Sequence, residues 1–325
     1  MGILNLPKEP HPIHHNVEYL SPSSLSQWQD CPQKFYLMRQ SEHKKSIKRE
    51  PQGTPAAVGA AFDAFVKSYL VKELSLSGVP SLDEMLKDNV TAKGKKRPPN
   101  WYDQVVEAGQ ALFKAYLDCG AMDYALQDGL NRVELWITEN IGEAYTHGRL
   151  DGATVHDIAF DWKIRGYASA PKSPTQGWTR SWKKGKLMDT SHKKVNTFFE
   201  KINPKWAQQL CIYNILLGHT VGDVMFVYFD EISMRNNRDN PVIDPMKLRI
   251  NQIRSQISPG FQQKVYNDLQ ECWNDMIRGR YPRAEPKESK CRAFASLCEA
   301  SEFCEPYANS YGADPEFEKL MKMRV

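Results

Sequence analysis

The sequence has no long hydrophobic run and no visible internal repeat. Its longest uninterrupted apolar stretch, from Val224 to Phe229, is far shorter than the roughly 20 residues that a membrane-spanning helix needs. Self-similarity at periods of about 20 to 50 residues, the mark of solenoids and propellers, is also missing. What is present is a chain of 325 residues, 41% of them hydrophobic and 25% charged, with a mean hydropathy of -0.58. We therefore expect a folded protein in water with a well-buried core.

The first residues also lack the features of a targeting signal. No basic region followed by an apolar stretch opens the chain, and Leu6 stands where a myristoylation motif needs Ser or Thr. The chain has seven cysteines, an odd number that does not suit a secreted framework of paired disulfides. These features predict a cytoplasmic protein, in the host cytoplasm if a phage encodes it.

Changes in hydrophobic period along the chain predict an α/β fold class. Apolar residues recur every three to four positions in the expected helices, whereas short β-branched and aromatic segments between glycine-containing turns predict strands. The expected order is helix, three strands, helix, strand, with helical additions at both ends, and this order predicts a mixed central sheet. The expected helices are 24–39, 58–70, 101–127, one that opens at 203–204 and one that opens at 258–259, and the expected strands are 133–138, 144–151, 156–163 and 224–230.

Two carboxylates and a lysine are expected to meet on the sheet. Asp161 and Lys163 are two apart on a predicted strand, so their side chains share a face while Trp162 points the other way. A short hairpin could return the chain so that Asp151, at the end of the preceding strand, lies beside Asp161. Such a cluster suits Mg²⁺ or Mn²⁺, which take oxygen ligands and can activate water against a phosphodiester. A solvated salt bridge across neighbouring strands is the alternative interpretation.

Four short motifs follow one another along the chain. They are Ser24-Leu25-Ser26 with Cys31 to Tyr36 (CPQKFY), Gly59 to Asp63 (GAAFD), Gly148 to Asp151 (GRLD) with Asp161-Trp162-Lys163, and Gln209 to Tyr213 (QLCIY). In this order they resemble the PD-(D/E)xK nuclease superfamily over about residues 24–304. The resemblance is to the RecB-like branch, which includes the nuclease domains of AddB-type recombination proteins and the CRISPR-associated adaptation exonucleases.

The resemblance implies a restriction-endonuclease-like αβββαβ core and a divalent metal, Mg²⁺ or Mn²⁺. It implies metal ligands at Asp63, Asp151, Asp161 and Trp162, and catalytic roles for Asp151, Asp161, Lys163, Gln209 and Tyr213. Asp63 is a departure, because the family usually has a histidine ligand four residues after the helical glycine. An aspartate can also bind a hard cation. The alternative for Asp63 is an ion pair with Lys67 one helical turn later, and Tyr213 could equally be a core residue.

Cysteines near both ends of the chain are similar to the family's iron–sulfur staple. The resemblance implies that Cys31, Cys291, Cys298 and Cys304 hold a four-iron four-sulfur cluster, although the gap between Cys291 and Cys298 is longer than usual. A four-cysteine zinc site is the first alternative, and unliganded buried thiols are the second. Cys119, Cys211 and Cys272 lie on apolar helical stripes and are interpreted as packing residues.

The net charge of +4 is unevenly distributed. Between Lys172 and Lys205 there are nine Lys or Arg residues against two acidic ones, with two tryptophans among them. This window predicts a loop that follows a nucleic acid backbone and stacks on its bases, with a merely solvated loop as the alternative. The expected contacts are Arg165, Trp178, Arg180, Trp182, Lys183, Lys184 and Lys186.

Together these features predict one nuclease domain over 24–310 between tails at 1–23 and 311–325. It would contain a helical insertion at about 71–130, a basic loop at about 165–203 and the cysteine cluster at 291–304. The expected activity is a metal-dependent DNA exonuclease that acts on single strands or duplex ends in recombination, repair or phage DNA processing. A helicase, a recombination protein or a second copy of the chain is the expected partner. The alternatives are a non-catalytic nucleic-acid-binding or assembly subunit, and a structure-specific or RNA-directed nuclease with the same site.

Overall fold

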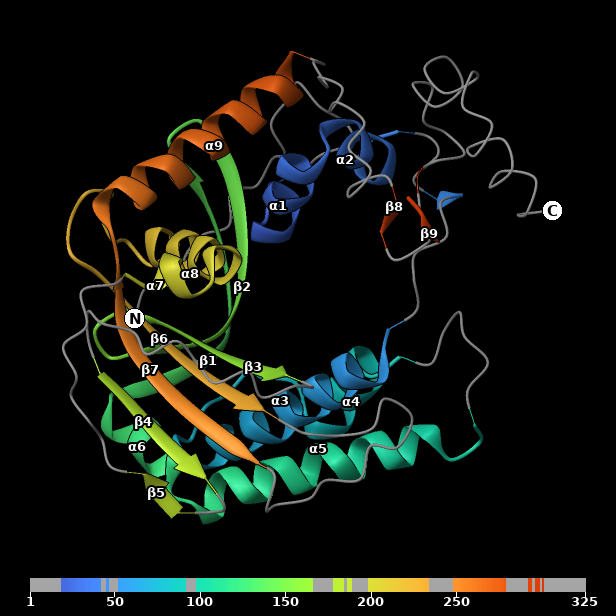
Figure 1. Ribbon diagram of the computed structural model, residues 1–325, viewed down its shortest axis with the longest axis vertical. Coiled ribbons are helices and arrows are strands. Elements are labelled where there is room, and N and C mark those ends of the chain that lie inside the picture. The colour runs from blue at the N-terminus through green and yellow to red at the C-terminus, as the bar shows by residue number, and fades with distance from the viewer. Residues whose placement is uncertain are drawn as a thin grey trace. The chain divides into compact units, whose positions relative to one another are not determined.

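The computed structural model describes residues 19–41, 45–46, 52–91, 98–165, 178–183, 186–188, 198–233, 248–278, 292–293, 296–298 and 300 (Figure 1). The chain divides into two compact units. Unit 1 comprises Met1–Glu50, Asn140–Thr146 and Asn267–Val325, and unit 2 comprises Pro51–Glu139 and His147–Tyr266.

A seven-stranded sheet forms the centre of unit 2, in the order β1-β2-β3-β6-β7-β4-β5. Strand β3 pairs with β6 in parallel, whereas the pairs β2–β3, β6–β7, β7–β4 and β4–β5 are antiparallel. The α/β class with a mixed sheet is therefore confirmed. The strands are β1 (Leu130–Ile141), β2 (Ala144–Thr154), β3 (Ala159–Arg165), β4 (Trp178–Lys183), β5 (Lys186–Met188), β6 (Met225–Ser233) and β7 (Arg249–Ile257).

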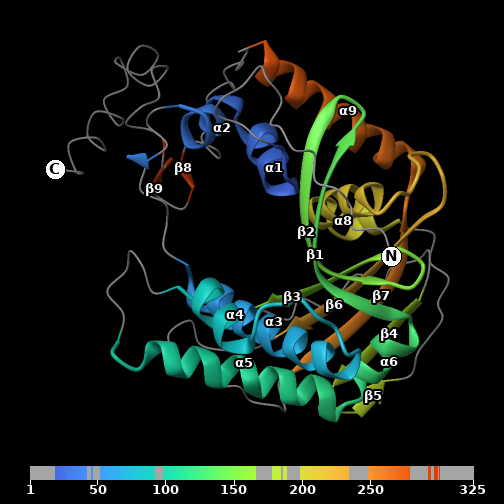
Figure 2. The same cartoon turned by 180° about the vertical axis from the view of Figure 1, so that it is seen from behind.

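Helices cover both faces of the sheet. Figures 1 and 2 show α3 and α5 along one side of strands β3 and β6, and α8 on the other side. Helices α3 and α5 approach closely because α5 has a glycine at the crossing: a Cβ atom at Gly109 would lie 2.5 Å from the Cβ atom of Ala61. The helices of this unit are α3 (Thr54–Glu73), α4 (Leu82–Asn89), α5 (Trp101–Asp118), α6 (Ala121–Gln127), α7 (Phe199–Ile202), α8 (Pro204–Leu216) and the first part of α9 (Pro259–Ile277).

The structure corrects several expected elements. The helix expected over 101–127 is two helices, because Gly120 adopts a left-handed conformation with φ of +80° between α5 and α6. The basic window was expected to be a loop, but it contributes strands β4 and β5 to the sheet. Strand β7 was not expected at all. Six of the nine residues in its sequence, RINQIRSQI, are polar, yet most of the strand is buried.

Unit 1 contains two short N-terminal helices and the second part of α9. The helix expected over 24–39 is broken between α1 (Pro22–Asp30) and α2 (Pro32–Arg39), where Cys31 is in an extended conformation. The side-chain amide of Gln29 donates to Asp268 of α9 at 2.6 Å. The described C-terminal residues of this unit include the small hairpin β8 (Arg292–Ala293) and β9 (Ser296–Leu297).

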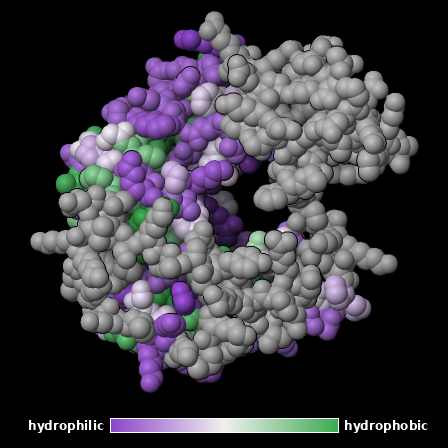
Figure 3. Space-filling view, viewed as in Figure 1, coloured by the Kyte–Doolittle hydropathy of each residue, from purple (hydrophilic) through white to green (hydrophobic). Residues whose placement is uncertain are grey.

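Among the helices that the structure describes, none combines the length and the apolar character needed to cross a bilayer. On the face shown in Figure 3, the coloured residues are mostly hydrophilic, with smaller hydrophobic groups between them.

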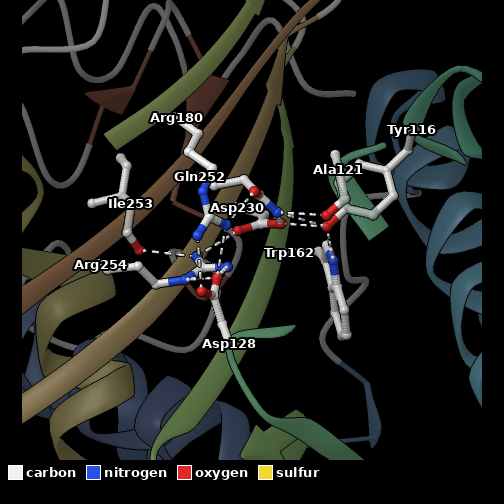
Figure 4. Close-up of polar contacts among 9 residues, drawn as sticks. All are labelled: Tyr116, Ala121, Asp128, Trp162, Arg180, Asp230, Gln252, Ile253 and Arg254. Atoms are coloured by element: carbon white, nitrogen blue, oxygen red, sulfur yellow. Dashed lines mark hydrogen bonds and ion pairs between the residues drawn. The ribbon is translucent and has the colours of Figure 1, made fainter. Parts of the chain in front are cut away.

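A network of buried charges joins four neighbouring strands on the α5 side of the sheet (Figure 4). Arg254 of β7 is 2% exposed and lies 2.7 Å from Asp230 of β6 and 2.7 Å from Asp128. Asp230 also accepts hydrogen bonds from Tyr116 of α5 and from Gln252 of β7. Because buried charges are costly unless they are paired, each of these groups depends on the others.

Replacement of Arg254 by methionine should destabilise the protein strongly. The variant keeps much of the side-chain volume but leaves Asp230 and part of Asp128 uncompensated, which costs about 3 to 5 kcal/mol in comparable buried pairs. Urea unfolding would measure the loss. The matched control is Lys114→Met, which removes an exposed ion pair with Asp118 and should cost no more than about 1 kcal/mol. Equal losses in the two variants would show that the buried network does not hold the sheet together.

Candidate active site

The antiparallel pairing of β2 and β3 brings the two motif aspartates together. Gly152 is opposite Phe160 and Ala153 is opposite Ala159. The same register, continued by one residue, puts Asp151 opposite Asp161, with both side chains on the same face. The expected pairing of Asp151 with Asp161 therefore forms, but the turn comes later than expected, because β2 continues to Thr154 and β3 begins at Ala159.

Alternation along β3 separates a polar face from an apolar one. Asp161 and Lys163 lie on one face, and the Lys163 ammonium is 2.7 Å from the Asp161 carboxylate. Trp162 is 5% exposed on the opposite face, where its indole N–H is 3.4 Å from the Tyr116 hydroxyl. The indole has no atom suited to a hard cation, so only the main-chain carbonyl of Trp162 could serve as a ligand.

Asp151 and Asp161 are neighbours in the strand register, and their surroundings shift the two pKa values in opposite directions. Burial and the neighbouring Asp151 carboxylate raise the pKa of Asp161 well above its usual value, against the opposing effect of Lys163. Burial also acts to raise the pKa of Asp151, but the cations of Lys67 and Lys163 outweigh it, and that pKa is lowered. Two adjacent carboxylates repel each other, so a cation that lies near both stabilises the charged pair.

Lys67 of α3 lies at the centre of a second group of carboxylates. Its ammonium is 2.6 Å from Asp63, 2.5 Å from Glu134 and 3.1 Å from Asp151, and the side chain is 2% exposed. Burial disfavours the charged form of Lys67, but the attraction of Asp151, Asp63 and Glu134 outweighs it, and the pKa of Lys67 is raised. Burial, with Asp151, raises the pKa of Asp63 to about 7 although Lys67 opposes the shift.

Glu134 is the residue of this group that the sequence analysis missed. It belongs to β1, but its φ of +53° interrupts the alternation of the strand, so that Val133 and Glu134 are both buried. Arg149 of β2 donates a hydrogen bond to its carboxylate. A glutamate between Val133 and Leu135 is part of no motif, and strand alternation would have turned it away from Lys67. Only the left-handed backbone conformation of Glu134 turns its side chain to Lys67.

The two residues expected on α8 also come together at this site. The helix begins at Pro204, where the Asn203 side chain accepts a hydrogen bond from the backbone of the first turn. The Gln209 amide donates to the Tyr213 hydroxyl at 2.9 Å. Burial and the nearby Asp151 carboxylate raise the pKa of Tyr213 to about 12, so its hydroxyl stays protonated at neutral pH.

Gly148 allows α8 to approach β2. A Cβ atom at this position would lie 2.7 Å from the Leu216 side chain and 3.2 Å from the Tyr213 ring. The glycine of the GRLD motif therefore has a packing role, because any larger residue would push Tyr213 away from Asp151.

The residues expected to contact DNA divide into two groups. Trp182 is 3% exposed and packs against Tyr124, and Arg180 is paired with Asp128 at 3.1 Å. Trp182 and Arg180 therefore have structural roles. Their positions do not agree with the prediction that they contact a nucleic acid. Lys183 and Lys186 are exposed and face each other across the β4–β5 turn. The side chains of Arg165 and Trp178, and all of Lys184, lie outside the described part of the chain.

Only part of the expected cysteine cluster can be placed. Cys31 precedes the first turn of α2, where its sulfur accepts a hydrogen bond from the Lys34 N–H. Cys298 packs against Leu37 and Met38 of the same helix. Cys291 and Cys304 lie outside the described residues.

Asp151 and Asp161 are two adjacent carboxylates, and oxygen donors of this kind suit a hard divalent cation. Within the described ranges, no three Asp, Glu, His or Cys side chains converge as a ready-made metal site. Asp63, Glu134 and Asp151 do converge on one position, but the Lys67 ammonium occupies it.

Comparisons with known proteins add little to this geometry. No family model matches the chain, and no curated protein matches it. Among solved structures it is similar to a protein from Eubacterium rectale named "Putative exonuclease", with a TM-score of 0.45 and 14% sequence identity, over 88% of this chain and 92% of that one. A likeness at this level carries no argument about activity, so the function is argued from the site itself.

Proposed function

We propose that this protein is a metal-dependent deoxyribonuclease of the PD-(D/E)xK type, in the RecB-like branch, and that it acts as an exonuclease on single-stranded DNA or duplex ends. The observation that carries the proposal is the pair of adjacent carboxylates, half-buried Asp151 and buried Asp161, with Lys163 on the same face of β3 as Asp161. The four sequence motifs support it, because three of them contribute side chains to this one site.

Each residue of the site has a part in the proposed reaction. Asp151 and Asp161, with the Trp162 carbonyl, would hold Mg²⁺ or Mn²⁺, which lowers the pKa of bound water and neutralises charge on the phosphate. Lys163 is 27% exposed, so its ammonium can hold a water molecule or a phosphate oxygen while it stays paired with Asp161. Gln209 and the protonated Tyr213 can donate hydrogen bonds to the DNA backbone.

A non-catalytic nucleic-acid-binding subunit is the second candidate. One observation favours it: Lys67 and Lys163 already pair with all four carboxylates of the site without a metal ion. A nuclease assay with Mg²⁺ or Mn²⁺ separates the two candidates, and the same assay with RNA tests an RNA-directed nuclease.

Asp161→Asn and Lys163→Met should each abolish cleavage. Both changes keep the side-chain size but remove a charge from the reacting face, and the loss should be at least about a hundredfold. The measurement is product length over time on end-labelled single-stranded DNA with Mn²⁺. Glu107→Gln, an exposed change on α5, is the control. Cleavage by Asp161→Asn at the rate of the wild type would exclude this site.

Trp136 and Arg149 form a pair of an exposed indole and a guanidinium next to the site. Trp136 is 60% exposed on β1, and the Arg149 guanidinium lies 5.1 Å from the centre of its ring. Arg149 also bonds to Glu134, which contacts Lys67, so the indole is next to the site. An exposed indole with a stacked arginine is a common platform for unpaired bases. We propose this pair as the base contact, and Lys183, Lys184 and Lys186 as contacts to phosphates.

The two kinds of contact should respond differently to salt. Trp136→Ala should weaken binding of single-stranded DNA by about 1 to 3 kcal/mol, or about 5- to 150-fold, at every salt concentration. Lys183→Ala with Lys186→Ala should instead flatten the salt dependence by about 0.7 per lost contact. Fluorescence anisotropy of a labelled oligonucleotide would measure both. Tyr102→Ala, at an exposed aromatic residue of α5, is the control, and a Trp136→Ala variant with the affinity of this control would rule out the platform.

We also propose that Cys31, Cys291, Cys298 and Cys304 hold a four-iron four-sulfur cluster. The packing of Cys298 against α2, the helix that Cys31 precedes, supports this assignment. A structural zinc ion is the alternative.

Protein purified without oxygen should be brown, with broad absorbance in the visible range, and should contain about four iron atoms per chain. Serine at Cys31 should remove the colour and the iron, whereas serine at Cys119, which follows the last residue of α5, should keep both. Colourless protein with one zinc ion per chain would instead identify a four-cysteine zinc site.

A further inference from the structure

The proposed reaction makes no use of Lys67, although this residue has the most closely surrounded charge in the site. Three carboxylates from three elements contact its ammonium: Asp63 from α3, Glu134 from β1 and Asp151 from β2. An ammonium with three carboxylate oxygens at 2.5 to 3.1 Å has the neighbours that a bound cation would have.

Lys67 cannot leave this position without disrupting the core. It lies in the middle of the 20-residue helix α3, and its side chain is 2% exposed. Its neighbours on the helix, Ala64, Val66 and Leu70, are fully buried. An ammonium removed from its partners there would be a buried, unpaired charge, which is far more costly than the existing arrangement.

The oxygens that remain for a metal ion are therefore few. Asp63 directs Oδ2 to Lys67 and keeps Oδ1 buried without a hydrogen-bond partner among the described residues, whereas Glu134 directs one oxygen to Lys67 and the other to Arg149. Asp151 contacts Lys67 through one oxygen, Oδ1, and lies opposite Asp161 in the register of β2 and β3. A divalent ion between Asp151 and Asp161 would therefore contact both carboxylates.

We propose that Lys67 is an internal cation that takes the place of a second metal ion. The site then binds a single divalent ion between Asp151 and Asp161, while Asp63 and Glu134 are counterions of Lys67 and not metal ligands. This inference rests on the proposed metal-dependent function, and it replaces the expectation that Asp63 is a ligand in the position of the family's histidine.

Titration of the full-length protein with Mn²⁺ tests this assignment without any measurement of activity. Calorimetry gives the stoichiometry and affinity, and electron paramagnetic resonance detects coupling between two neighbouring Mn²⁺ ions. The wild type should bind one ion that Asp161→Asn loses, with affinity at least about tenfold lower in that variant. Asp63→Asn should keep one ion and lose clearly less affinity than Asp161→Asn, because it alters a counterion and not a ligand.

Lys67→Met should open the second position. With the ammonium removed from three carboxylates, this variant should bind two Mn²⁺ ions with a coupled resonance signal, and it should gain more thermal stability from Mn²⁺ than the wild type. Lys72→Met, an exposed change on the same helix, is the control and should keep one ion. If Lys67→Met does not fold, the Mn²⁺ affinities of Asp63→Asn and Asp161→Asn still show whether Asp63 is a metal ligand.

The outcomes distinguish this inference from the proposed function. A loss of Mn²⁺ in Asp63→Asn equal to that in Asp161→Asn would make Asp63 a ligand and overturn the inference alone. Folded Lys67→Met that still binds one ion would do the same. A wild type that binds no Mn²⁺, or that binds Mn²⁺ no more tightly than Asp161→Asn does, would overturn the proposed metal-dependent function together with the inference.

Discussion

The register of β3 is the constraint on which both the fold and the site depend. Its parallel pairing with β6 puts Trp162 beside Asp230 and Lys163 beside Glu231. One face of the strand thus meets the buried network of Arg254 and Asp230, and the other carries the carboxylates of the site. A slip by one residue would exchange the two faces and bury Asp161 among aromatic rings. Paired charges on both faces make that slip costly, so the same interactions fix the fold and position Asp161 and Lys163.

Local patterns were sufficient to predict the elements that carry this strand. The spacing of Asp161 and Lys163 predicts their common face, and the short turn after Asp151 predicts the hairpin that brings it back. Asn203 followed by Pro204 marks the start of α8 through a cap that involves only neighbouring residues. These predictions agree with the structure because each depends on the geometry of one or two elements.

Features that depend on distant partners were not predictable in this way. Strand β7 looks polar because Gln252 and Arg254 serve buried partners more than 20 residues away, Asp230 above all. The basic window looked like a loop because Arg180 finds its counterion, Asp128, 52 residues earlier in the chain. Glu134 reaches Lys67 only through a left-handed backbone conformation, which no residue type other than glycine announces in a sequence.

The two lysines of the site illustrate how similar surroundings can give different roles. Lys163 is 27% exposed and can meet a substrate, whereas Lys67 is 2% exposed and can meet only the protein. The unusual aspartate at position 63 follows from this difference. A neutral histidine there would accompany a metal ion but would leave Lys67 with one counterion fewer, whereas Asp63 supplies a charge one helical turn away. Asp63 and Lys67 are therefore best understood as one ion pair on α3, in which each side chain compensates the charge of the other.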